Sequence, residues 1–230
     1  MVFEGVVEGP LGSPVGPWWL SLGNLCLPHP RKLQGESWSM GKVQSVCVFC
    51  GSSPGIDPDY RKAARELGQF LVSRGITLVY GGGKVGLMGE MARAALELHG
   101  RVIGVMPERL VERELVQEGL TELYVTDTMH ARKSKMHQLA DGYIALPGGY
   151  GTYEEIFETL SWLHIGIHEK PLGLLNVNGY FNPLLQMLAH TVKQGFARPD
   201  ALSLIVTASD PESLLHRMER FKPERGDRWG

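Results

Sequence analysis

From Ser45 onward the chain alternates short apolar runs with longer amphipathic segments, and this alternation limits what it can fold into. The runs expected to be strands are, in order, Val46 to Phe49, Thr77 to Tyr80, Val102 to Met106, Glu122 to Val125, Tyr143 to Leu146, Leu172 to Val177 and Leu202 to Val206. The segments with helical periodicity are Pro58 to Arg74, Leu87 to His99, Met129 to Ala140, Tyr153 to Ile165, Tyr180 to Gln194 and Pro211 to Arg220. The pattern predicts an α/β fold, a Rossmann-like doubly wound parallel sheet of about seven strands with helices on both faces. Such sheets bind ligands at the carboxyl ends of their strands, near a topological switch point.

Residues 1–43 are rich in glycine and proline, which leaves little room for a helix or a paired strand. We therefore expect a flexible tail over residues 1–43, one folded domain over 44–222 and a flexible C-terminus over 223–230. Two readings of the tail stay open. The apolar stretch from Trp18 to Leu22 could be a docking patch, or the tail could be translated upstream sequence with Met40 as the natural start.

Charge and cysteine content restrict which partners and which cellular compartment are expected. A formal net charge of -2 gives no general attraction to nucleic acid or to an anionic membrane, so neither is an expected partner. No apolar run has the length of a membrane span, and the first residues lack a basic leader. An odd count of three cysteines fits a reducing compartment, and we expect a cytoplasmic protein. Cys47 and Cys50 match a C-x-x-C motif but should point to opposite faces of a strand as buried, inert thiols.

The stretch from Ala145 to Glu155 reads as strand, tight loop and helix. Three glycines within four residues stand before the helix, and glycine amides beside a helix N-terminus form an anion site of the size of a phosphate. Glu155 falls one helical turn beyond this anion site. The alternative is a capping box, in which Thr152 caps the helix and Glu155 only satisfies a backbone donor. Three preceding glycines favour the binding site, because a cap does not need them.

Two other loops follow predicted strands. Ser52 and Ser53 can donate to a phosphate or a sugar, although this loop could equally be a turn with Asp57 as the helix cap. The loop from Tyr80 to Gly89 contains G-x-G-x-x-G, a weak match to a dinucleotide fingerprint, with Glu108 as either a ribose-binding acid or a helix-start residue. It lacks the spacing of a nucleoside-triphosphate loop. Two glycine loops on one sheet predict a ligand larger than phosphate, such as a mononucleotide.

Cationic and histidine side chains are the remaining candidates for binding or catalytic residues. Arg132 can hold an anion with two parallel donors, a geometry that lysine cannot copy. Alone, the basic cluster around it would be a solvated helix face. His164 and His168 are spaced to share a metal, but Gly166 suggests that the helix ends between them, and no third ligand stands nearby. We expect hydrogen-bonding roles for both histidines, and neither a metal nor a cofactor.

Taken together, P-G-G-x-G-T-x-x-E at residues 147–155, M-H-x-R-K at 129–133 and G-G-G-x-x-G-L-M-G at 81–89 resemble the LOG family over about residues 45–221. These are cytokinin riboside 5'-monophosphate phosphoribohydrolases, often labelled lysine decarboxylases. The resemblance implies Arg132 and Glu155 as the catalytic pair, and a homodimer. Substrate contacts implied by the resemblance or expected from the loops are Ser53, Gly82, Gly83, Met88, Glu114, Lys133, Gly148, Gly149, Tyr150, Gly151, Thr152, Tyr153, Glu154 and Ser161. Ser161 replaces the family's threonine and keeps its hydroxyl.

The implied reaction is hydrolysis of the N-glycosidic bond of an adenosine-type 5'-monophosphate, which releases the free base and ribose 5-phosphate. The Glu155 carboxylate would stabilise the oxocarbenium-like sugar and direct water. Arg132 would position the nucleotide or ease departure of the base. Three rivals stay open: a nucleotide-binding carrier on the same sheet, an NAD-dependent oxidoreductase, and a lysine decarboxylase, for which no pyridoxal-binding arrangement is evident.

Overall fold

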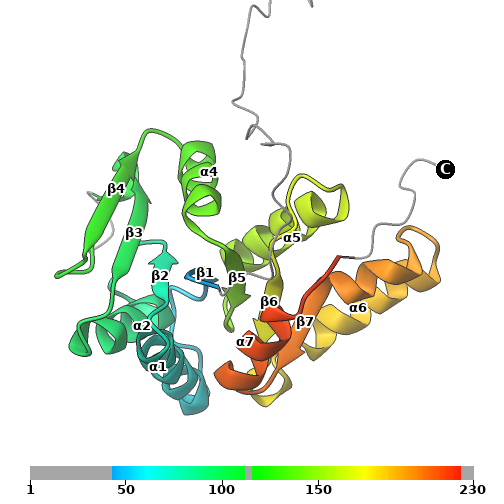
Figure 1. Cartoon of the computed structure of the whole chain (residues 1–230), viewed down its shortest axis with the longest axis horizontal. Helices are drawn as coiled ribbons and strands as arrows, with labels where there is room; N and C mark the ends of the chain where they lie inside the picture. Colours follow the sequence, from blue (N-terminus) through cyan, green and yellow to red (C-terminus); the bar gives the residue numbers. More distant parts are fainter. Residues whose placement is uncertain (1–42, 112–115, 224–230) are drawn as a thin grey trace, which may run out of the picture. The chain divides into compact units, whose positions relative to one another are not determined.

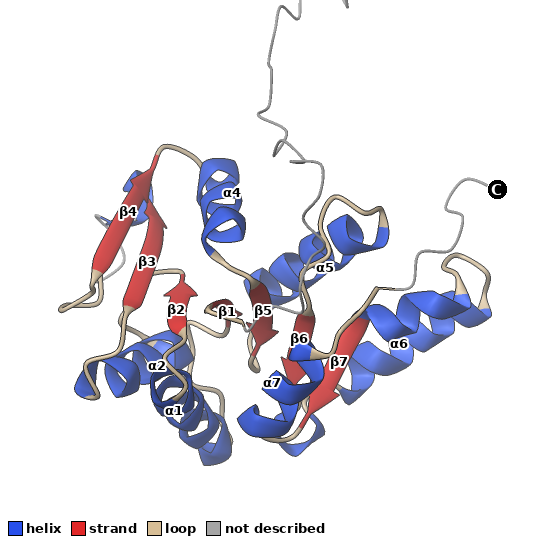
Figure 2. Cartoon of the chain, viewed as in Figure 1, coloured by secondary structure: helices blue, strands red, loops and turns tan. Residues whose placement is uncertain are grey.

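The computed structural model describes residues 43–111 and 116–223, and these form a seven-stranded, all-parallel sheet with helices on both faces (Figure 1, Figure 2). The predicted fold class is confirmed. The strands are β1 (Ser45–Phe49), β2 (Thr77–Tyr80), β3 (Val102–Pro107), β4 (Glu122–Thr126), β5 (Gly142–Ala145), β6 (Leu172–Leu175) and β7 (Ile205–Ala208). The helices are α1 (Pro58–Ser73), α2 (Gly86–Glu97), α3 (Glu108–Val111), α4 (Met129–Leu139), α5 (Tyr150–His164), α6 (Asn182–Lys193) and α7 (Pro211–Glu219), with 3-10 turns at Val177–Gly179 and Pro199–Leu204.

The strand order places a topological switch point beside β1. From β1 the chain adds β2, β3 and β4 on one side, and it then returns to place β5, β6 and β7 on the other, giving the order β4-β3-β2-β1-β5-β6-β7. β1 and β5 pair in parallel with Phe49 opposite Ala145, so both strands end at the same edge. The loops after β1 and β5 therefore diverge where a doubly wound sheet binds its ligands.

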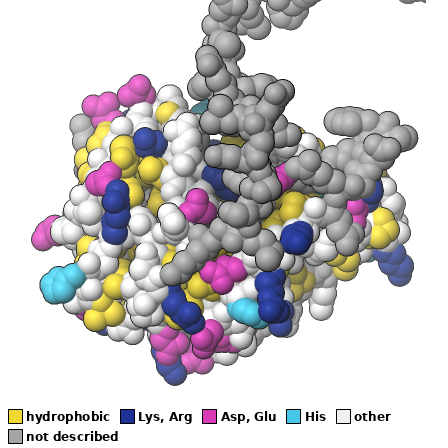
Figure 3. Space-filling view, in the orientation of Figure 1, with side chains coloured by type: hydrophobic (Ala, Val, Ile, Leu, Met, Phe, Trp, Pro, Cys, Tyr) yellow, Lys and Arg dark blue, Asp and Glu magenta, His cyan; other side chains and the backbone are white. Residues whose placement is uncertain are grey.

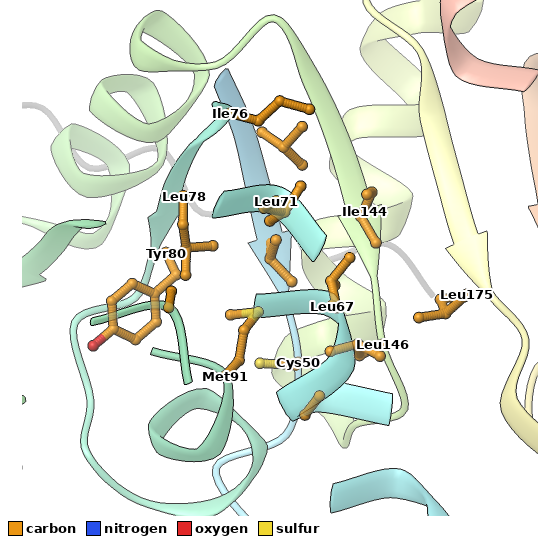
Figure 4. Packing of buried hydrophobic residues seen from close by; sticks show 14 of the residues in the cluster. Cys50, Leu67, Leu71, Ile76, Leu78, Tyr80, Met91, Ile144, Leu146 and Leu175 are labelled. Carbon is orange, nitrogen blue, oxygen red and sulfur yellow. The ribbon is translucent and has the colours of Figure 1, made fainter. Parts of the chain in front are cut away.

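Strand alternation divides the core between the two faces of the sheet. Val46, Val48 and Cys50 point to the face covered by α1, α2 and α7, whereas Cys47 and Phe49 point to the face covered by α4, α5 and α6. Figure 4 shows Cys50 near Met91 of α2, Leu67 of α1 and Leu146, which follows β5. Burial raises the pKa of the Cys47 and Cys50 thiols, and both are free. The prediction of buried thiols on opposite faces of the sheet is confirmed.

Two element starts differ by three residues from the predictions, and the strand predicted over Leu172 to Val177 ends at Leu175 because a 3-10 turn begins at Val177. Helix α5 begins at Tyr150, three residues earlier than expected, because the chain turns into the helix at Gly149. The predicted strand from Leu202 starts only at Ile205, since Pro199 begins a 3-10 turn that runs to Leu204. Glu108 opens the short helix α3, the second of its two predicted roles.

Surface features of the described part agree with the composition. On the face drawn in Figure 3, basic and acidic side chains are intermixed and no broad field of one sign is visible. None of the helices within residues 43–111 and 116–223 combines the length and the apolar character that crossing a membrane requires.

Candidate active site

The loops after β1 and β5 touch each other at the switch point. The Gly51 amide donates to the Pro147 carbonyl at 3.1 Å. A side chain on Gly148 would collide with the Thr152 hydroxyl and lie 2.8 Å from the Gly51 nitrogen, so packing alone requires glycine at 148. Ser53 is exposed at this edge.

Helix α5 starts at this junction without a side-chain cap. Gly149 is the N-cap residue, and the first helical bond runs from the Tyr153 amide to the Gly149 carbonyl at 3.1 Å. The capping-box alternative is therefore wrong: Thr152 lies in the first turn with its side chain buried, and Glu155 lies in the second turn. The first-turn amides have no intrahelical acceptor, and the helix dipole adds positive potential there. This is the geometry of an anion site.

Gly149 and Gly151 line the open side of this helix start. An added Cβ at either position would meet no atom within 4 Å. Neither glycine has a positive φ angle. Glycine at these two positions is thus required neither by packing nor by backbone conformation, which leaves close approach of a ligand as the physical reason for it.

The glycines of the Tyr80 to Gly89 loop have a different explanation. A side chain on Gly86 would collide with the backbone of Ser52, and one on Gly89 with the Lys84 carbonyl. The first amides of α2 are already used, because those of Leu87 and Met88 donate to the Gly51 carbonyl at 3.0 and 3.4 Å. The G-x-G-x-x-G match therefore reflects packing of α2 against the β1 loop, without the free amides that a pyrophosphate needs.

Gly82 and Gly83 also lie inside the protein. Gly82 has a φ of +82°, and its carbonyl accepts from the Gln117 amide at 3.0 Å. Gly83 forms an isolated bridge with Val116. Met88 is half-buried beside Gly81. Gly82, Gly83 and Met88 are three of the predicted substrate contacts. Gly82 and Gly83 are buried against residues Val116 and Gln117.

Arg132 projects from α4 to β3 and to the residue that follows β2. Its Nε donates to the Val105 carbonyl at 3.0 Å and its Nη2 to the Gly81 carbonyl at 3.5 Å. A side chain on Gly81 would overlap the Arg132 guanidinium, which explains the first glycine of that loop. Thr128 caps α4 by accepting from the Ala131 amide, so the helix start beneath Arg132 is well defined.

Lys133 joins α4 to α5 through two carboxylates. Its ammonium donates to Glu154 Oε1 at 2.6 Å and to Glu158 Oε1 at 2.8 Å. The Lys133 side chain is only 12% exposed and that of Glu158 only 18%. Glu158 was not among the predicted site residues, although its spacing of four from Glu154 places both on one helix face, a signal that could have found it.

Glu155 lies on α5 between these groups and carries a perturbed carboxyl. Burial raises its pKa to about 7, the nearby Arg132 guanidinium opposes that rise, and the charge of Glu154 adds to it. The side chain is half-buried. A carboxyl that titrates near neutrality at the switch point is a candidate for chemistry.

This shift predicts a pH-dependent stability difference between wild type and Glu155→Gln. Between its ordinary value of 4.5 and about 7, the folded carboxyl binds more protons than the unfolded one, so stability falls as pH rises through this window. Gln cannot ionise. The variant should melt higher than wild type at pH 8 and at the same temperature near pH 4, as measured by calorimetry at both values. An equal difference at both pH values would contradict the shift.

Other predicted residues lie apart from this cluster or outside the described part. Ser161 is exposed on α5, six residues beyond Glu155, which is about 9 Å along the helix. Glu114 falls outside the described residues.

Helix α5 ends at His164, and the His168 ring contacts the Thr159 carbonyl at 3.1 Å, so the hydrogen-bonding role predicted for His168 is confirmed. In the described ranges, no three His, Cys, Asp or Glu side chains are grouped so as to hold a metal ion.

Fold and site together define a class: a Rossmann-like α/β protein with a glycine-lined helix N-terminus and a perturbed carboxylate at its switch point. Residues 88–218 match the family model described as "Possible lysine decarboxylase". The chain is 46% identical over 192 residues to the cytokinin riboside 5'-monophosphate phosphoribohydrolase LOG3 of Arabidopsis thaliana, covering 84% of this chain and 89% of that protein. It is 49% identical over 183 residues to the rice (Oryza sativa subsp. japonica) protein named "Probable cytokinin riboside 5'-monophosphate phosphoribohydrolase LOGL2", covering 80% and 75%. The chain belongs to the LOG family.

Solved structures share the fold. A molybdenum cofactor binding protein from Rippkaea orientalis superposes with a TM-score of 0.59 at 25% identity, over 79% of this chain and 98% of that one. The molybdenum cofactor carrier protein of Chlamydomonas reinhardtii gives 0.56 at 21% identity, over 76% and 96%, a likeness of fold alone.

Proposed function

We propose that this protein hydrolyses the N-glycosidic bond of adenosine 5'-monophosphates, either AMP itself or derivatives that carry an N6 substituent, releasing the free base and ribose 5-phosphate. The observation that carries the proposal is the Glu155 carboxyl, held one turn inside an uncapped, glycine-lined helix start and beside Arg132. The relatives LOG3 and LOGL2 are named for this activity. No resident cofactor or metal is part of the proposal.

The helix start suits the phosphate of such a substrate. Amides of residues 149–152 can donate to the phosphate oxygens, and the open space at Gly149 and Gly151 admits the group to backbone distance. Ser53, on the neighbouring loop, can add a hydroxyl donor. This placement leaves the ribose over the second turn of α5, where Glu155 lies.

Glu155 and Arg132 then divide the chemistry. As the C1'–N bond breaks, its electron pair goes to the base and positive charge grows on the sugar, where the Glu155 carboxylate stabilises it. A water molecule adds to C1', and one of its protons ends on the released base. Arg132, fixed by the Val105 and Gly81 carbonyls, holds the nucleotide so that this carbon faces the carboxylate.

Gly151→Ala tests the ligand role of the open glycine. Alanine favours a helix and meets no atom here, so the variant should melt at or slightly above the wild-type temperature. Its methyl group should nevertheless weaken AMP binding about tenfold or more, by crowding the phosphate. Thermal melts and titration calorimetry with AMP measure both quantities. Gly148→Ala is the matched contrast, because there the methyl group would collide with Thr152 and stability should fall. Unchanged AMP affinity in Gly151→Ala would contradict the proposed phosphate site.

A carrier protein is the second candidate, favoured by the likeness to the molybdenum cofactor binding protein at 25% identity. A carrier would hold a nucleotide-like ligand on the same loops without cleaving it. The two candidates differ in whether Glu155 is needed for turnover. Incubation with AMP, N6-isopentenyl-AMP, GMP and CMP, followed by chromatography of the freed base, decides between them. Release from the adenine nucleotides supports hydrolysis, and binding without release supports a carrier.

The other rivals are weaker. The α2 amides that a dinucleotide would need are bonded to Gly51, which argues against NAD. A decarboxylase would need a lysine available to a pyridoxal group, whereas Lys133 is held by two carboxylates and Lys170 donates to the His137 carbonyl. Fluorescence titration with NADH and an absorbance spectrum of the purified protein test these two readings.

We further propose that residues 44–222 form the catalytic unit and that it acts as a homodimer in the cytoplasm. Ile165 and Ile167, just after α5, are 55% and 62% exposed and offer an apolar surface for a second subunit. Trp162 is half-buried beside His137, so it offers less exposed surface than these two residues. Light scattering that gives a monomer mass would contradict the dimer. Loss of activity on deletion of residues 1–40 would contradict the domain assignment.

A further inference from the structure

Tyr180 reaches the phosphate loop from a distant part of the chain. It stands between the 3-10 turn after β6 and helix α6, and its hydroxyl donates to the Gly148 carbonyl at 2.5 Å. Tyr180 lies 32 residues beyond Gly148, and no sequence motif pairs them. The bond therefore exists only because the β6–α6 segment folds back over the glycine loop.

The Gly148 carbonyl and the Gly149 amide belong to one planar peptide group. In a trans peptide the C=O and the N–H point in opposite directions, so a carbonyl fixed toward Tyr180 aims the Gly149 N–H away from it. A Cβ built on Gly149 would meet no atom within 4 Å, so there is open space beside this residue at the start of α5. Because glycines flank this peptide on both sides, no Cβ resists its rotation, and an external bond must hold its direction.

The ring of Tyr180 is itself held firmly. It stacks on Tyr153 with ring centroids 6.5 Å apart, and it meets Tyr60 and Phe181 edge to face at 5.6 and 5.1 Å. Tyr153 belongs to α5, Tyr60 to α1, and Phe181 is the N-cap residue of α6, so the ring is held by three elements. Such packing leaves the phenol little freedom to follow a rotating peptide.

We propose that Tyr180 is a positioning residue that locks the Gly148–Gly149 peptide with its N–H directed at the substrate phosphate. The proposal rests on the proposed phosphate site and assigns Tyr180 a role that acts through the peptide bond rather than through contact with the substrate. Without the hydroxyl, the peptide rotates among several orientations, and only a fraction of molecules presents the Gly149 amide to the phosphate.

Tyr180→Phe keeps the ring and removes the hydroxyl, which bonds to the Gly148 carbonyl and also to the Tyr153 side chain. We expect the dissociation constants of AMP and ribose 5-phosphate, measured by calorimetry, to rise about fivefold to tenfold, as loss of one hydrogen bond gives. Adenosine, which has no phosphate, should inhibit the variant and wild type equally. Tyr124→Phe is the matched control, since the Tyr124 hydroxyl donates to Glu122 on β4, away from the site. It should leave all three affinities unchanged.

The Gly149 amide provides a second measurement that needs no ligand. In Tyr180→Phe, NMR relaxation dispersion at this amide should show microsecond to millisecond exchange that wild type and Tyr124→Phe lack. Equal losses for adenosine and for the phosphate ligands would overturn the proposal, as would a quiet Gly149 amide. These measurements are independent of hydrolysis. If the protein bound ribose 5-phosphate but released no base, the proposed enzyme activity would be rejected, and the binding measurements would still test the role of Tyr180.

Discussion

Glu155→Gln is expected to abolish release of base while AMP still binds within a few-fold of the wild-type affinity. The amide matches the carboxyl in shape but cannot offset positive charge on the sugar, and loss of one preorganised electrostatic group costs about 100-fold to 1000-fold in kcat. Phosphate binding depends on backbone amides of the α5 start, which the substitution leaves in place. Chromatography of freed adenine gives the rate, and calorimetry with AMP gives the affinity.

Glu97→Gln is the control for this variant, because Glu97 pairs with Arg65 at 2.9 Å between α2 and α1, outside the site. It should retain wild-type turnover. The ionised form of Glu155 is the active one in this mechanism, so wild-type kcat/KM should rise with pH through about 7. Wild-type turnover in Glu155→Gln would reject the mechanism. A kcat/KM that falls through the same pH range would show that the protonated carboxyl acts instead.

Arg132→Lys should lower kcat/KM about 100-fold, although lysine keeps the positive charge. The guanidinium uses Nε on the Val105 carbonyl of β3 and Nη2 on the Gly81 carbonyl after β2, and this fork fixes the direction of its remaining nitrogen. A lysine ammonium is a single point that cannot hold both carbonyls and face a nucleotide. A loss confined to KM would assign Arg132 to nucleotide binding, and a loss confined to kcat would assign it to departure of the base.

Arg217→Lys is the matched control for this second variant. Arg217 also donates to a strand carbonyl, that of Thr207 on β7 at 2.6 Å, but it lies outside the site. It should keep full activity, and its melting temperature shows what an arginine-to-lysine change at a strand carbonyl costs the fold. If both variants were equally active, Arg132 would have no part in the reaction.

Much of the fold and part of the site could be predicted from patterns between neighbours in the chain. The strand from Thr77 to Tyr80 has its predicted limits, because a short β-branched and aromatic run ends at consecutive glycines. The start of α5 was misplaced, since Thr152 satisfies a local capping rule that the structure does not use. There the contact of Gly148 with the β1 loop starts the helix earlier, and a local rule cannot include it.

By itself, then, the sequence determined the α/β alternation, the strand, glycine loop and helix around residue 149, and the Arg132 and Glu155 candidates. These depend on periodicity and on spacing within a few residues, which set local backbone conformation. The tertiary structure alone decided that β5 returns beside β1, that α2 uses its first amides on Gly51, and that the Tyr180 hydroxyl reaches the Gly148 carbonyl. Those pairings join segments up to about a hundred residues apart, and they are chosen by which apolar faces can be buried together.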